Sequence, residues 1–325
     1  MRKRSRFKLF TYLALAGLIT LVFFAFNSLV FDPSVPGNSP ISKELYKVIS
    51  PSTYRFILNQ PEVCEKKTPF LILMIPVTLK DAEARTAIRR TWGQDGLVPG
   101  VSILHLFVVG QPARSDPVLQ EHLQKESKEH GDIIQMDFVD SYQNLTIKTM
   151  MIMNWVATYC QSAWYAMKID ADIFLNVHYL VDYLHGQGES RKDYITGSVI
   201  SDAIPHRDSI NKWYISEDLY PKSWYPPYVS GAAYVFSTDL AGKISWASRF
   251  VQPIPLEDVY VGLCLDVLGV KPVYATQFLG LRNLFEVRRL KYERCTFATR
   301  IIVNGFKPKY LIRIWHDFQK SHFAC

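Results

Sequence analysis

The stretch KIDADIFLN, residues 168–176, places two aspartates, Asp170 and Asp172, one residue apart inside an apolar run. Ionised carboxylates are costly to bury unless a cation or several hydrogen bonds compensate them. The segment that leads into them, WYAMKID at 164–170, has the apolar character of a buried strand. The two aspartates therefore stand at the end of a strand, and their role depends on what the rest of the chain builds around it.

Strand-like and helix-like segments alternate on both sides of this stretch. The apolar patterns predict strands over 70–77, 102–110, 132–138 and 164–170, and helices over 81–93, 115–131, 144–160 and 256–269, with a further helix after Ser237. The segment 212–234, rich in proline and aromatic residues, reads as irregular loops. Continuous apolar strands separated by helices predict a mostly parallel sheet that is buried on both faces. Ligands of such sheets bind outside the carboxyl ends of the strands, where Asp170 and Asp172 lie.

Several readings of the D-x-D pair compete. The aspartates could cap a turn or pair with nearby Arg and Lys side chains. Phosphatases of the haloacid-dehalogenase type carry D-x-D near the start of their domain, whereas this pair lies deep in the chain and is followed by Ile173. Carboxylates also hold Mg²⁺ or Mn²⁺ together with nucleotide phosphates. The chain has no glycine-rich phosphate loop, which argues against P-loop NTPases and the usual dinucleotide-binding enzymes.

The N-terminus combines a basic cluster with an apolar run. Residues 1–8 read MRKRSRFK, and an apolar segment follows at 9–26. As a helix this segment covers about 27 Å, close to the ~30 Å of a bilayer core. The positive-inside rule then predicts a cytoplasmic tail at 1–8, a transmembrane signal-anchor at 9–26, a proline-rich lumenal stem at 27–67 and a lumenal domain at 68–325. A cleaved signal peptide and a buried core helix are the alternatives.

Cysteine usage fits a lumenal setting. The 5 cysteines are widely spaced and include no C-x-x-C, so a structural zinc site is not expected. One or two disulfides with one thiol left over are expected instead. The sequon at Asn144 predicts N-glycosylation. The net charge of +7 does not imply a nucleic-acid partner, because a lumenal domain meets none.

Several stretches together resemble the β1,3-galactosyltransferase group of glycosyltransferase family 31. In family order and spacing they are EARTAIRRTWG (83–93), LFVVG (106–110), HGDIIQMDFVDSYQNLTIKTMMIMNWV (130–156), YAMKIDADIFLNV (165–177), KWYI (212–215), YPPYVSGAAYVFS (225–237) and LEDVYVGLCLDVLG (256–269). The resemblance runs from about Cys64 to the C-terminus. The related β1,3-N-acetylglucosaminyltransferases share most of these motifs.

The resemblance implies an α/β fold of the GT-A type, in which helices flank a mostly parallel central sheet after an N-terminal transmembrane helix. It implies an inverting enzyme of the Golgi membrane that moves galactose from UDP-galactose, in β1,3 linkage, to a glycan acceptor on a glycoprotein or glycolipid. Two alternatives stay open: a transferase that uses UDP-N-acetylglucosamine, and a catalytically weak member that acts as a glycan-binding or complex-forming subunit. A homo- or hetero-oligomer is left open as well.

On the donor side, Asp172 matches the family's ligand of Mn²⁺ (or Mg²⁺), and Asp170 matches the residue near the ribose and the metal waters. Lys168 and Ala171 flank these aspartates and are expected beside the donor.

Arg85 and Arg89 lie in the matching donor-side helix, and their guanidinium groups suit phosphate oxygens. Without the resemblance, a solvated helix face explains both arginines equally well.

On the acceptor side, Asp258 matches the family's catalytic base, which takes the proton of the attacking hydroxyl. Without the resemblance, an acidic residue that favours a helix N-terminus explains it better. The residues expected to contact the acceptor are Trp213, Tyr214, Gly231 and Glu257.

Three positions depart from the family pattern. Asn304 stands where the family has a metal-binding histidine, so a metal set of Asp172, Asp170 and Asn304 is expected. Ala171 replaces the serine of D-S-D. Val229 replaces a cysteine, which removes one half of a family disulfide.

The predicted topology can be tested in sealed microsomes that contain the full chain. We expect protease to remove the tail at 1–8 and to leave the domain intact, because the segment at 9–26 keeps the domain on the lumenal side. Immunoblotting with one antibody against each end reads this out, and detergent permeabilisation is the control. Digestion of the domain in intact vesicles would contradict the predicted orientation.

Overall fold

The computed structural model describes residues 39–186, 191–278 and 292–320, and the chain divides into two units, residues 1–40 and 41–325. The fold below is that of the second unit. The predicted anchor at 9–26 lies outside the described residues. Among those that are described, no helix is long and apolar enough to cross a membrane.

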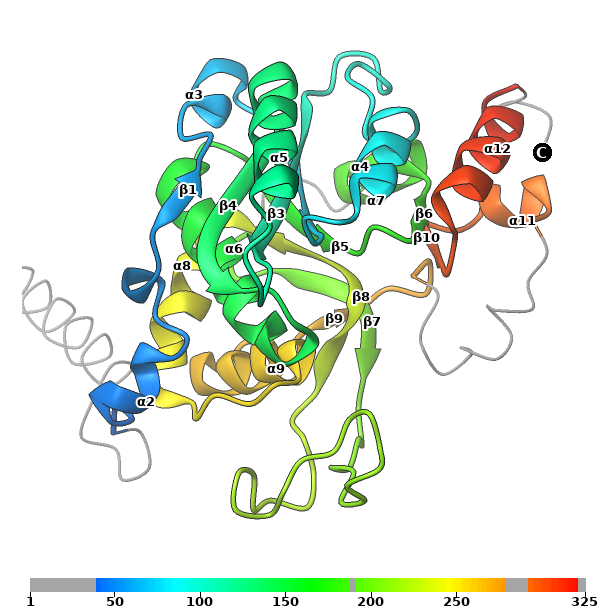
Figure 1. The fold of residues 1–325 in the computed structure, drawn as a ribbon. Helices are drawn as coiled ribbons and strands as arrows, with labels where there is room; N and C mark the ends of the chain where they lie inside the picture. Colours follow the sequence, from blue (N-terminus) through cyan, green and yellow to red (C-terminus); the bar gives the residue numbers. More distant parts are fainter. Residues whose placement is uncertain (1–38, 187–190, 279–291, 321–325) are drawn as a thin grey trace, which may run out of the picture. The chain divides into compact units, whose positions relative to one another are not determined.

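The central element is a sheet that, within the described residues, has eight strands in the order β1–β4–β3–β2–β5–β8–β7–β9 (Figure 1). The strands are β1 (Phe56–Leu58), β2 (Leu71–Pro76), β3 (Ile103–Gln111), β4 (Ile133–Val139), β5 (Tyr165–Ile169), β7 (Ile195–Ile200), β8 (Tyr228–Ser237) and β9 (Val273–Tyr274). Strands β4, β3, β2 and β5 are mutually parallel, which confirms the predicted core of the sheet. Strand β8 is antiparallel to both β5 and β7, and its first part lies in the segment 212–234 that was predicted as irregular loops.

The sheet is buried on both faces because successive side chains of each strand point to opposite sides. In β2, Leu71, Leu73 and Ile75 belong to one hydrophobic core, and Ile72 and Met74 belong to the other. This arrangement explains why the strands read as unbroken apolar runs.

Helices cover the two faces in separate groups (Figure 1). Helices α6, α8 and α9 contribute to the core on one face, and α4, α5, α7, α11 and α12 to the core on the other. The helices are α2 (Lys43–Lys47), α3 (Val63–Lys67), α4 (Ala82–Arg89), α5 (Pro117–His130), α6 (Leu145–Tyr159), α7 (Val177–His185), α8 (Thr238–Ala247), α9 (Glu257–Leu268), α11 (Arg294–Ala298) and α12 (Pro308–Gln319). Each helix predicted from the sequence is present, with boundaries shifted by a few residues.

The start of α5 shows how the chain sets a boundary. Asp116 is the N-cap, and its side chain accepts a hydrogen bond from the Leu119 N–H. Pro117 follows in the first turn, where its missing N–H costs nothing. Gly131 ends the helix with a φ of 65°, a left-handed conformation that suits glycine.

The segment assigned to the stem differs from the expectation. From Ile41 onward the chain already belongs to the compact unit. Strand β1 pairs antiparallel with β4, and the Trp155 indole N–H donates a hydrogen bond to Asn59 Oδ1. In the structure the domain therefore begins at 41 rather than at 68. The short elements before 68 bury apolar side chains, which the proline-rich composition of this segment did not predict.

Cysteine pairing follows the expected pattern in the described residues. Cys64 and Cys160 form a disulfide that ties the segment before β2 to the end of α6. Among the described residues, the free cysteine is Cys264, which is buried in α9. The expected leftover thiol is thus present, and Val229, at the position of the family cysteine, is buried in β8.

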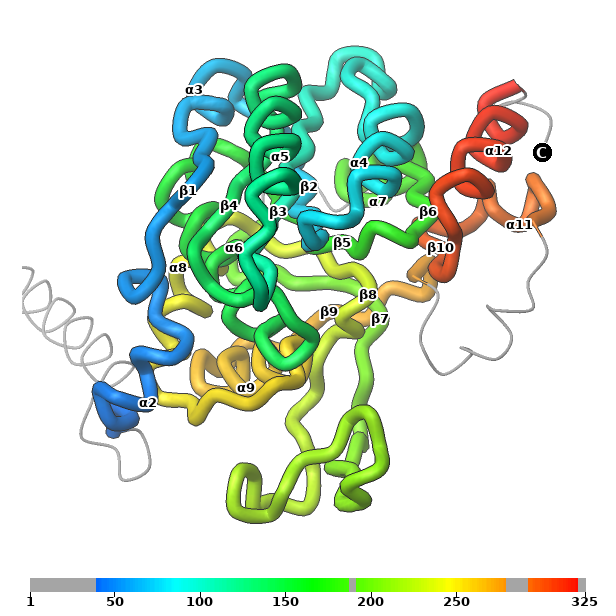
Figure 2. Tube along the Cα trace, in the orientation of Figure 1, coloured from blue at the N-terminus to red at the C-terminus, as the bar shows by residue number. Residues whose placement is uncertain are grey.

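The C-terminal part of the chain lies at one edge of the domain, beside α4 and strand β6, Ile173–Leu175 (Figure 2). Helix α12 packs against α4, and β10 (Ile302–Asn304) pairs antiparallel with β6. Strand β6 directly follows Asp172, so the chain end adjoins the D-x-D turn. Between β7 and β8 an extended loop, residues 201–227, projects from the sheet (Figure 1).

Candidate active site

The two aspartates lie at the carboxyl end of β5, as predicted. The Asp170 N–H donates to the Ala232 carbonyl at 3.0 Å, which fixes the turn to β8. The Asp172 carbonyl accepts from the N–H groups of Gly305 and Phe306 at 3.0 and 2.8 Å. The D-x-D turn, with Ala171 at its centre, is thus held by backbone hydrogen bonds on both sides.

Lys168 is the cation that compensates Asp170. Its side chain is only 4% exposed, and its Nζ lies 2.7 Å from Asp170 Oδ1 and 3.0 Å from Glu257 Oε1. The same ammonium donates a hydrogen bond to the Gly231 carbonyl. Burial alone would lower the pKa of Lys168, but Asp170 and Glu257 outweigh it and raise the pKa, so the ammonium stays charged. The side chain therefore lies beneath the site rather than beside a donor, which differs from the expectation.

Glu257 faces the interior, not an acceptor. Its Oε2 accepts hydrogen bonds from the Thr149 hydroxyl at 3.2 Å and the Tyr234 hydroxyl at 3.4 Å, while Oε1 faces Lys168. Burial raises the pKa of Glu257 to about 7, against the lowering effect of Lys168. The predicted acceptor contact is not what the structure shows, because every neighbour of this carboxylate is a buried protein group.

Asp258, the neighbouring residue, occupies the start of α9 and is half-buried. Its Oδ2 accepts the Gly231 N–H at 3.0 Å, and its Oδ1 accepts the Val259 N–H at 2.9 Å. Burial raises the pKa of Asp258, and these two hydrogen bonds lower it again in part. A carboxylate whose pKa is raised in this way is a better proton acceptor than an exposed one.

Gly231 joins these groups. A Cβ at this position would lie 2.5 Å from Glu257 Oε1 and 3.2 Å from Asp258 Oδ2, so only glycine allows β8 to approach α9 this closely. Its carbonyl accepts from Lys168 while its N–H donates to Asp258. Gly231 therefore positions the site through its backbone and offers no side chain to an acceptor.

Asp172 and Asn304 lie on adjoining segments. Asn304 is paired in register with Ile173, the residue after Asp172. Solvent reaches the Asp172 carboxylate, yet the surrounding protein, and after it the charge of Asp170, raise its pKa. Among the described residues no ion pair is recorded for Asp172, and no group of three or more His, Cys, Asp or Glu forms a metal cage. The Asp172 carboxylate forms no ion pair among the described residues, lies within the field of Asp170 and adjoins the strand that carries Asn304, and such a set fits a hard divalent cation that also binds a phosphate ligand.

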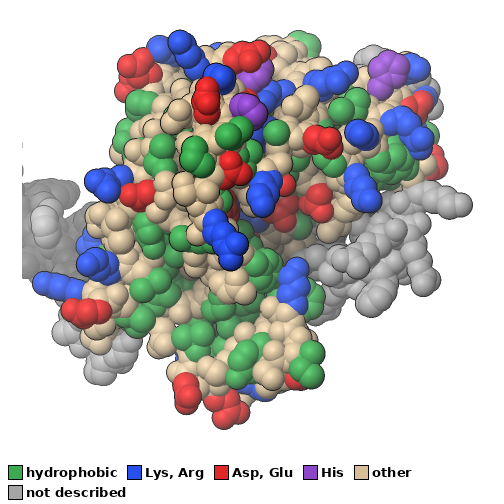
Figure 3. All heavy atoms as spheres, in the orientation of Figure 1, with side chains coloured by type: hydrophobic (Ala, Val, Ile, Leu, Met, Phe, Trp, Pro, Cys, Tyr) green, Lys and Arg blue, Asp and Glu red, His purple; other side chains and the backbone are tan. Residues whose placement is uncertain are grey.

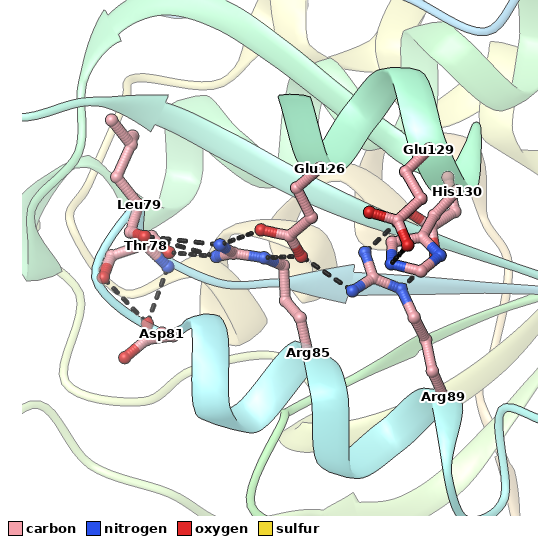
Figure 4. A network of polar contacts seen from close by, with 9 residues as sticks. Thr78, Leu79, Asp81, Arg85, Arg89, Glu126, Glu129 and His130 are labelled. Carbon is pink, nitrogen blue, oxygen red and sulfur yellow. Dashed lines mark hydrogen bonds and ion pairs between the residues drawn. The ribbon is translucent and has the colours of Figure 1, made fainter. Parts of the chain in front are cut away.

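Arg85 and Arg89 are not part of this cluster. Figure 4 shows both arginines of α4 directed at Glu126 of α5. Arg85 Nη2 lies 2.6 Å from Glu126 Oε2, and its Nη1 donates to the Thr78 carbonyl at 2.9 Å. Arg89 contacts Glu126 Oε1 at 2.7 Å and Asp132 Oδ2 at 2.6 Å. Both guanidinium groups bind protein partners. The structure therefore shows an internal ion network in place of the expected contact with a uridine phosphate.

The network fixes the loop that follows β2. Burial raises the pKa of Asp132, but hydrogen bonds from Arg89 and His105 outweigh this effect and bring the pKa to about 2. Asp132 therefore remains ionised at any physiological pH. Arg85 in turn holds the carbonyl groups of Thr78 and Leu79 at the carboxyl end of β2, so the arginines shape this edge of the sheet indirectly.

Three tyrosines lie within the electrostatic reach of the Asp258 carboxylate. Tyr225 and Tyr228 belong to the aromatic-rich segment 212–234, whereas Tyr142 was not predicted as a site residue. Burial is the main cause of a raised pKa at Tyr142, Tyr225 and Tyr228, and the charge of Asp258 adds to it at all three. The stretches that contain them were noted for their resemblance, but no periodicity pointed to the tyrosines. Of the expected aromatic contacts, Trp213 and Tyr214 are 41% and 39% exposed on the loop 201–227.

Asn144 and Thr146 of the sequon are both used by the fold. The Asn144 side-chain amide donates to the Val139 carbonyl at 2.8 Å, and the buried Thr146 hydroxyl donates to the Ile254 carbonyl at 2.6 Å. N-glycosylation of Asn144 stays a prediction.

A space-filling view shows acidic side chains in a hollow at the centre of one face, with basic side chains around it (Figure 3). A charged cleft of this kind suits a ligand that is itself charged.

Comparison with known proteins gives consistent matches. A family model described as Galactosyltransferase matches residues 83–276. Beta-1,3-galactosyltransferase 1 of Mus musculus is 43% identical over 279 residues, which is 85% of this chain and 82% of that protein. Beta-1,3-galactosyltransferase 2 of Mus musculus is also 43% identical over 279 residues, and here the chain spans only 65% of the relative's length. The solved WbbM bifunctional glycosyltransferase aligns over 79% of this chain and 50% of its own with a TM-score of 0.40 and 9% identity, a similarity that carries no argument.

The internal role of Arg85 can be tested with Arg85→Met. Because the change leaves Glu126 with a single cationic partner in a part-buried setting, we expect a loss of about 3 kcal/mol in the free energy of unfolding. Chemical denaturation measures this loss, and Arg90→Met, at the exposed C-cap of the same helix, is the matched control with an expected change below about 0.5 kcal/mol. Wild-type stability combined with a loss of UDP affinity would instead restore the phosphate-binding role.

Proposed function

This chain belongs to the galactosyltransferase family, and from that membership we propose that it transfers galactose from UDP-galactose, in β1,3 linkage, to a hydroxyl group of a glycan acceptor. We also propose the finer assignments that go with it: a GT-A-type fold, an inverting reaction and a place in the Golgi membrane with the domain in the lumen. The identity of 43% with beta-1,3-galactosyltransferases supports the donor and the linkage.

One observation carries the proposal. The D-x-D turn and the candidate base, far apart in the sequence, are connected through a single ammonium and a single glycine. Lys168 Nζ contacts Asp170 and the Gly231 carbonyl, and the Gly231 N–H holds Asp258. A site for a sugar nucleotide needs a cation-binding pair and a proton acceptor side by side, and this contact chain supports such an arrangement.

The reaction follows from these placements. Asp258 takes the proton of the acceptor hydroxyl as its oxygen forms the bond to the anomeric carbon. The bond from that carbon to the diphosphate breaks on the opposite side, UDP leaves, and the configuration inverts. Lys168 and Gly231 keep Asp258 and Asp170 in fixed positions throughout, so little reorganisation is needed.

Asp172, Asp170 and Asn304 would hold Mn²⁺ or Mg²⁺, and the cation would neutralise the negative charge of the leaving diphosphate. Lys168 already compensates one Asp170 oxygen, which leaves Asp172 as the principal carboxylate for the metal. The Asn304 amide oxygen binds Mn²⁺ more weakly than a histidine nitrogen would, so we expect metal affinity to be modest.

The activity is tested by measuring UDP release from the full chain, purified in detergent, against a panel of UDP-sugars and glycan acceptors. We expect UDP-galactose to be the best donor. A preference for UDP-N-acetylglucosamine would support the related transferase. An absence of transfer with every donor, together with glycan binding, would support a non-catalytic subunit.

Asp258→Asn tests the base. An amide cannot take up a proton, so we expect kcat to fall by a factor on the order of 10² to 10⁴. Since the amide accepts only one of the two backbone N–H groups, the free energy of unfolding should also fall by about 1 kcal/mol. UDP affinity, measured by calorimetry, should not change. Normal turnover by the folded variant would show that another residue is the base.

Asp172→Ala and Asn304→His test the metal site. Calorimetric titration of Mn²⁺ in the presence of UDP should show no measurable metal binding for Asp172→Ala, because the one carboxylate without a protein cation is lost. Asn304→His should bind Mn²⁺ as tightly as wild type or more tightly. Asp218→Ala, in the exposed part of the loop 201–227, is the control. Undiminished Mn²⁺ binding by Asp172→Ala would contradict the assignment.

A further inference from the structure

The loop 201–227 has a fixed shape, although it contains no helix or strand beyond one isolated bridge. Arg207 lies at its centre and donates to three carbonyl groups, those of Ile215 at 2.8 Å, Tyr220 at 2.6 Å and Lys222 at 3.1 Å. The Tyr225 N–H donates to the Ala203 carbonyl at 2.9 Å, which closes the base of the loop. A loop tied in this way presents its side chains in defined positions.

Two neighbouring side chains of this loop meet Tyr142, which lies in the short helix η2 (Tyr142–Asn144) before α6. Lys212 Nζ lies 4.6 Å from the centroid of the Tyr142 ring and 6.0 Å from that of Trp213. The Trp213 side chain lowers the pKa of Tyr142, against the larger raising effect of burial. The Trp213 N–H donates to Asn211 Oδ1 at 2.8 Å, which orients the indole.

This cluster is beside the proposed reaction centre and is open to solvent. The η2 segment leads directly into α6, whose Thr149 hydroxyl donates to Glu257 Oε2 at 3.2 Å at the start of α9. The charge of Asp258 also acts on the Tyr142 hydroxyl. Tyr142 and Trp213 are each 41% exposed. No ion pair is recorded for Lys212 among the described residues, and its ammonium is held against aromatic faces.

We propose that Tyr142 and Lys212 join Trp213, which the resemblance already assigns to the acceptor, in one wall that binds the acceptor pyranose. This inference rests on the proposed function and names the residues that would select its second substrate. The Trp213 ring offers a flat apolar face to the C–H face of a sugar, and the Tyr142 hydroxyl hydrogen-bonds to a ring substituent next to the reacting hydroxyl. Lys212 is a positioning residue, because its charge keeps the Tyr142 ring in place.

The acceptor is favoured over the donor for a geometric reason. The reacting hydroxyl must come within hydrogen-bonding reach of its base, so groups next to Asp258 contact the acceptor. The donor diphosphate belongs with Asp172, which directly precedes β6, and with Asn304, the last residue of β10. The wall therefore faces the substrate that supplies the hydroxyl.

The test uses the full chain in detergent, with benzyl β-pyranosides of glucose, galactose, N-acetylglucosamine and N-acetylgalactosamine as acceptor probes. The variants are Tyr142→Phe, Trp213→Leu, Lys212→Met and Lys212→Arg, and Trp224→Leu, an exposed tryptophan of the same loop, is the matched control. Initial rates are measured against acceptor concentration at saturating UDP-galactose. UDP affinity and the slow hydrolysis of UDP-galactose without acceptor are measured in parallel.

We expect the acceptor KM to rise about 3- to 10-fold in Tyr142→Phe and Lys212→Met, as for the loss of one hydrogen bond, and about 10-fold in Trp213→Leu. Lys212→Arg should keep the wild-type KM, since it preserves the cation over the ring. UDP affinity and hydrolysis should stay unchanged in all of these variants. Acceptor KM values equal to wild type, or a loss of UDP affinity that parallels the rise in KM, would overturn the proposal.

Failure of the proposed function gives a different result. If the wild type transfers no sugar, binding of the same benzyl pyranosides is measured by saturation-transfer NMR. Weaker binding by Tyr142→Phe and Trp213→Leu than by Trp224→Leu would still support the wall. No binding by the wild type, or equal binding by all variants, would overturn it.

Discussion

The buried ammonium of Lys168 is the constraint on which the site depends. A charge taken out of water needs partners on every side, and the partners here come from three different elements. Asp170 follows β5, Gly231 lies in β8, and Glu257 opens α9. Because the Lys168 ammonium binds partners on all three elements, it connects the end of the parallel sheet, the antiparallel strand β8 and the helix that carries Asp258. Removing either carboxylate partner would leave the ammonium in a dry setting with too little compensation.

The different orientations of the Glu257 and Asp258 carboxylates follow from that constraint. Adjacent residues at the start of a helix point in different directions, so only one of the two carboxylates can turn toward Lys168. Glu257, with the longer side chain, reaches inward and is surrounded by hydroxyl groups. Asp258 is held by two backbone N–H groups and keeps contact with the open side of the site. The close approach at Gly231 makes both placements possible.

A second charged network holds the same edge of the sheet in place from the other face. Arg85 and Arg89 join α4 to α5 and to the start of β4, and Arg85 also holds the loop after β2. Lys148 of α6 is a further buried cation that binds a loop carbonyl group. Its Nζ lies 2.7 Å from Asp140 and donates to the Val77 carbonyl at 2.8 Å. Loops at the carboxyl ends of parallel strands have no ladder of their own, so buried cations that bind their carbonyl groups give them a defined shape. Buried ion pairs of this kind contribute little net stability, and we infer that their value here is geometric.

Local patterns in the sequence determined the parallel core of the sheet, its covering helices and the position of Asp170, Asp172 and Asp258, because apolar periodicity and motif spacing are properties of short segments. The period of two even places Lys168 on the same side of its strand as Asp170. The antiparallel strand β8 was not separated from its loop, since prolines and aromatic residues precede it and its pairing is decided by distant strands. Only the tertiary structure decided which charges meet: Arg85 with Glu126 rather than a phosphate, Lys168 with Glu257, and Tyr142 with the loop that carries Lys212 and Trp213. An ion pair or ring contact between distant segments cannot be recognised from the sequence around either partner, because each residue fits its own segment equally well without the other. The free energy of the contact arises only when the fold brings the two side chains together and removes them from water.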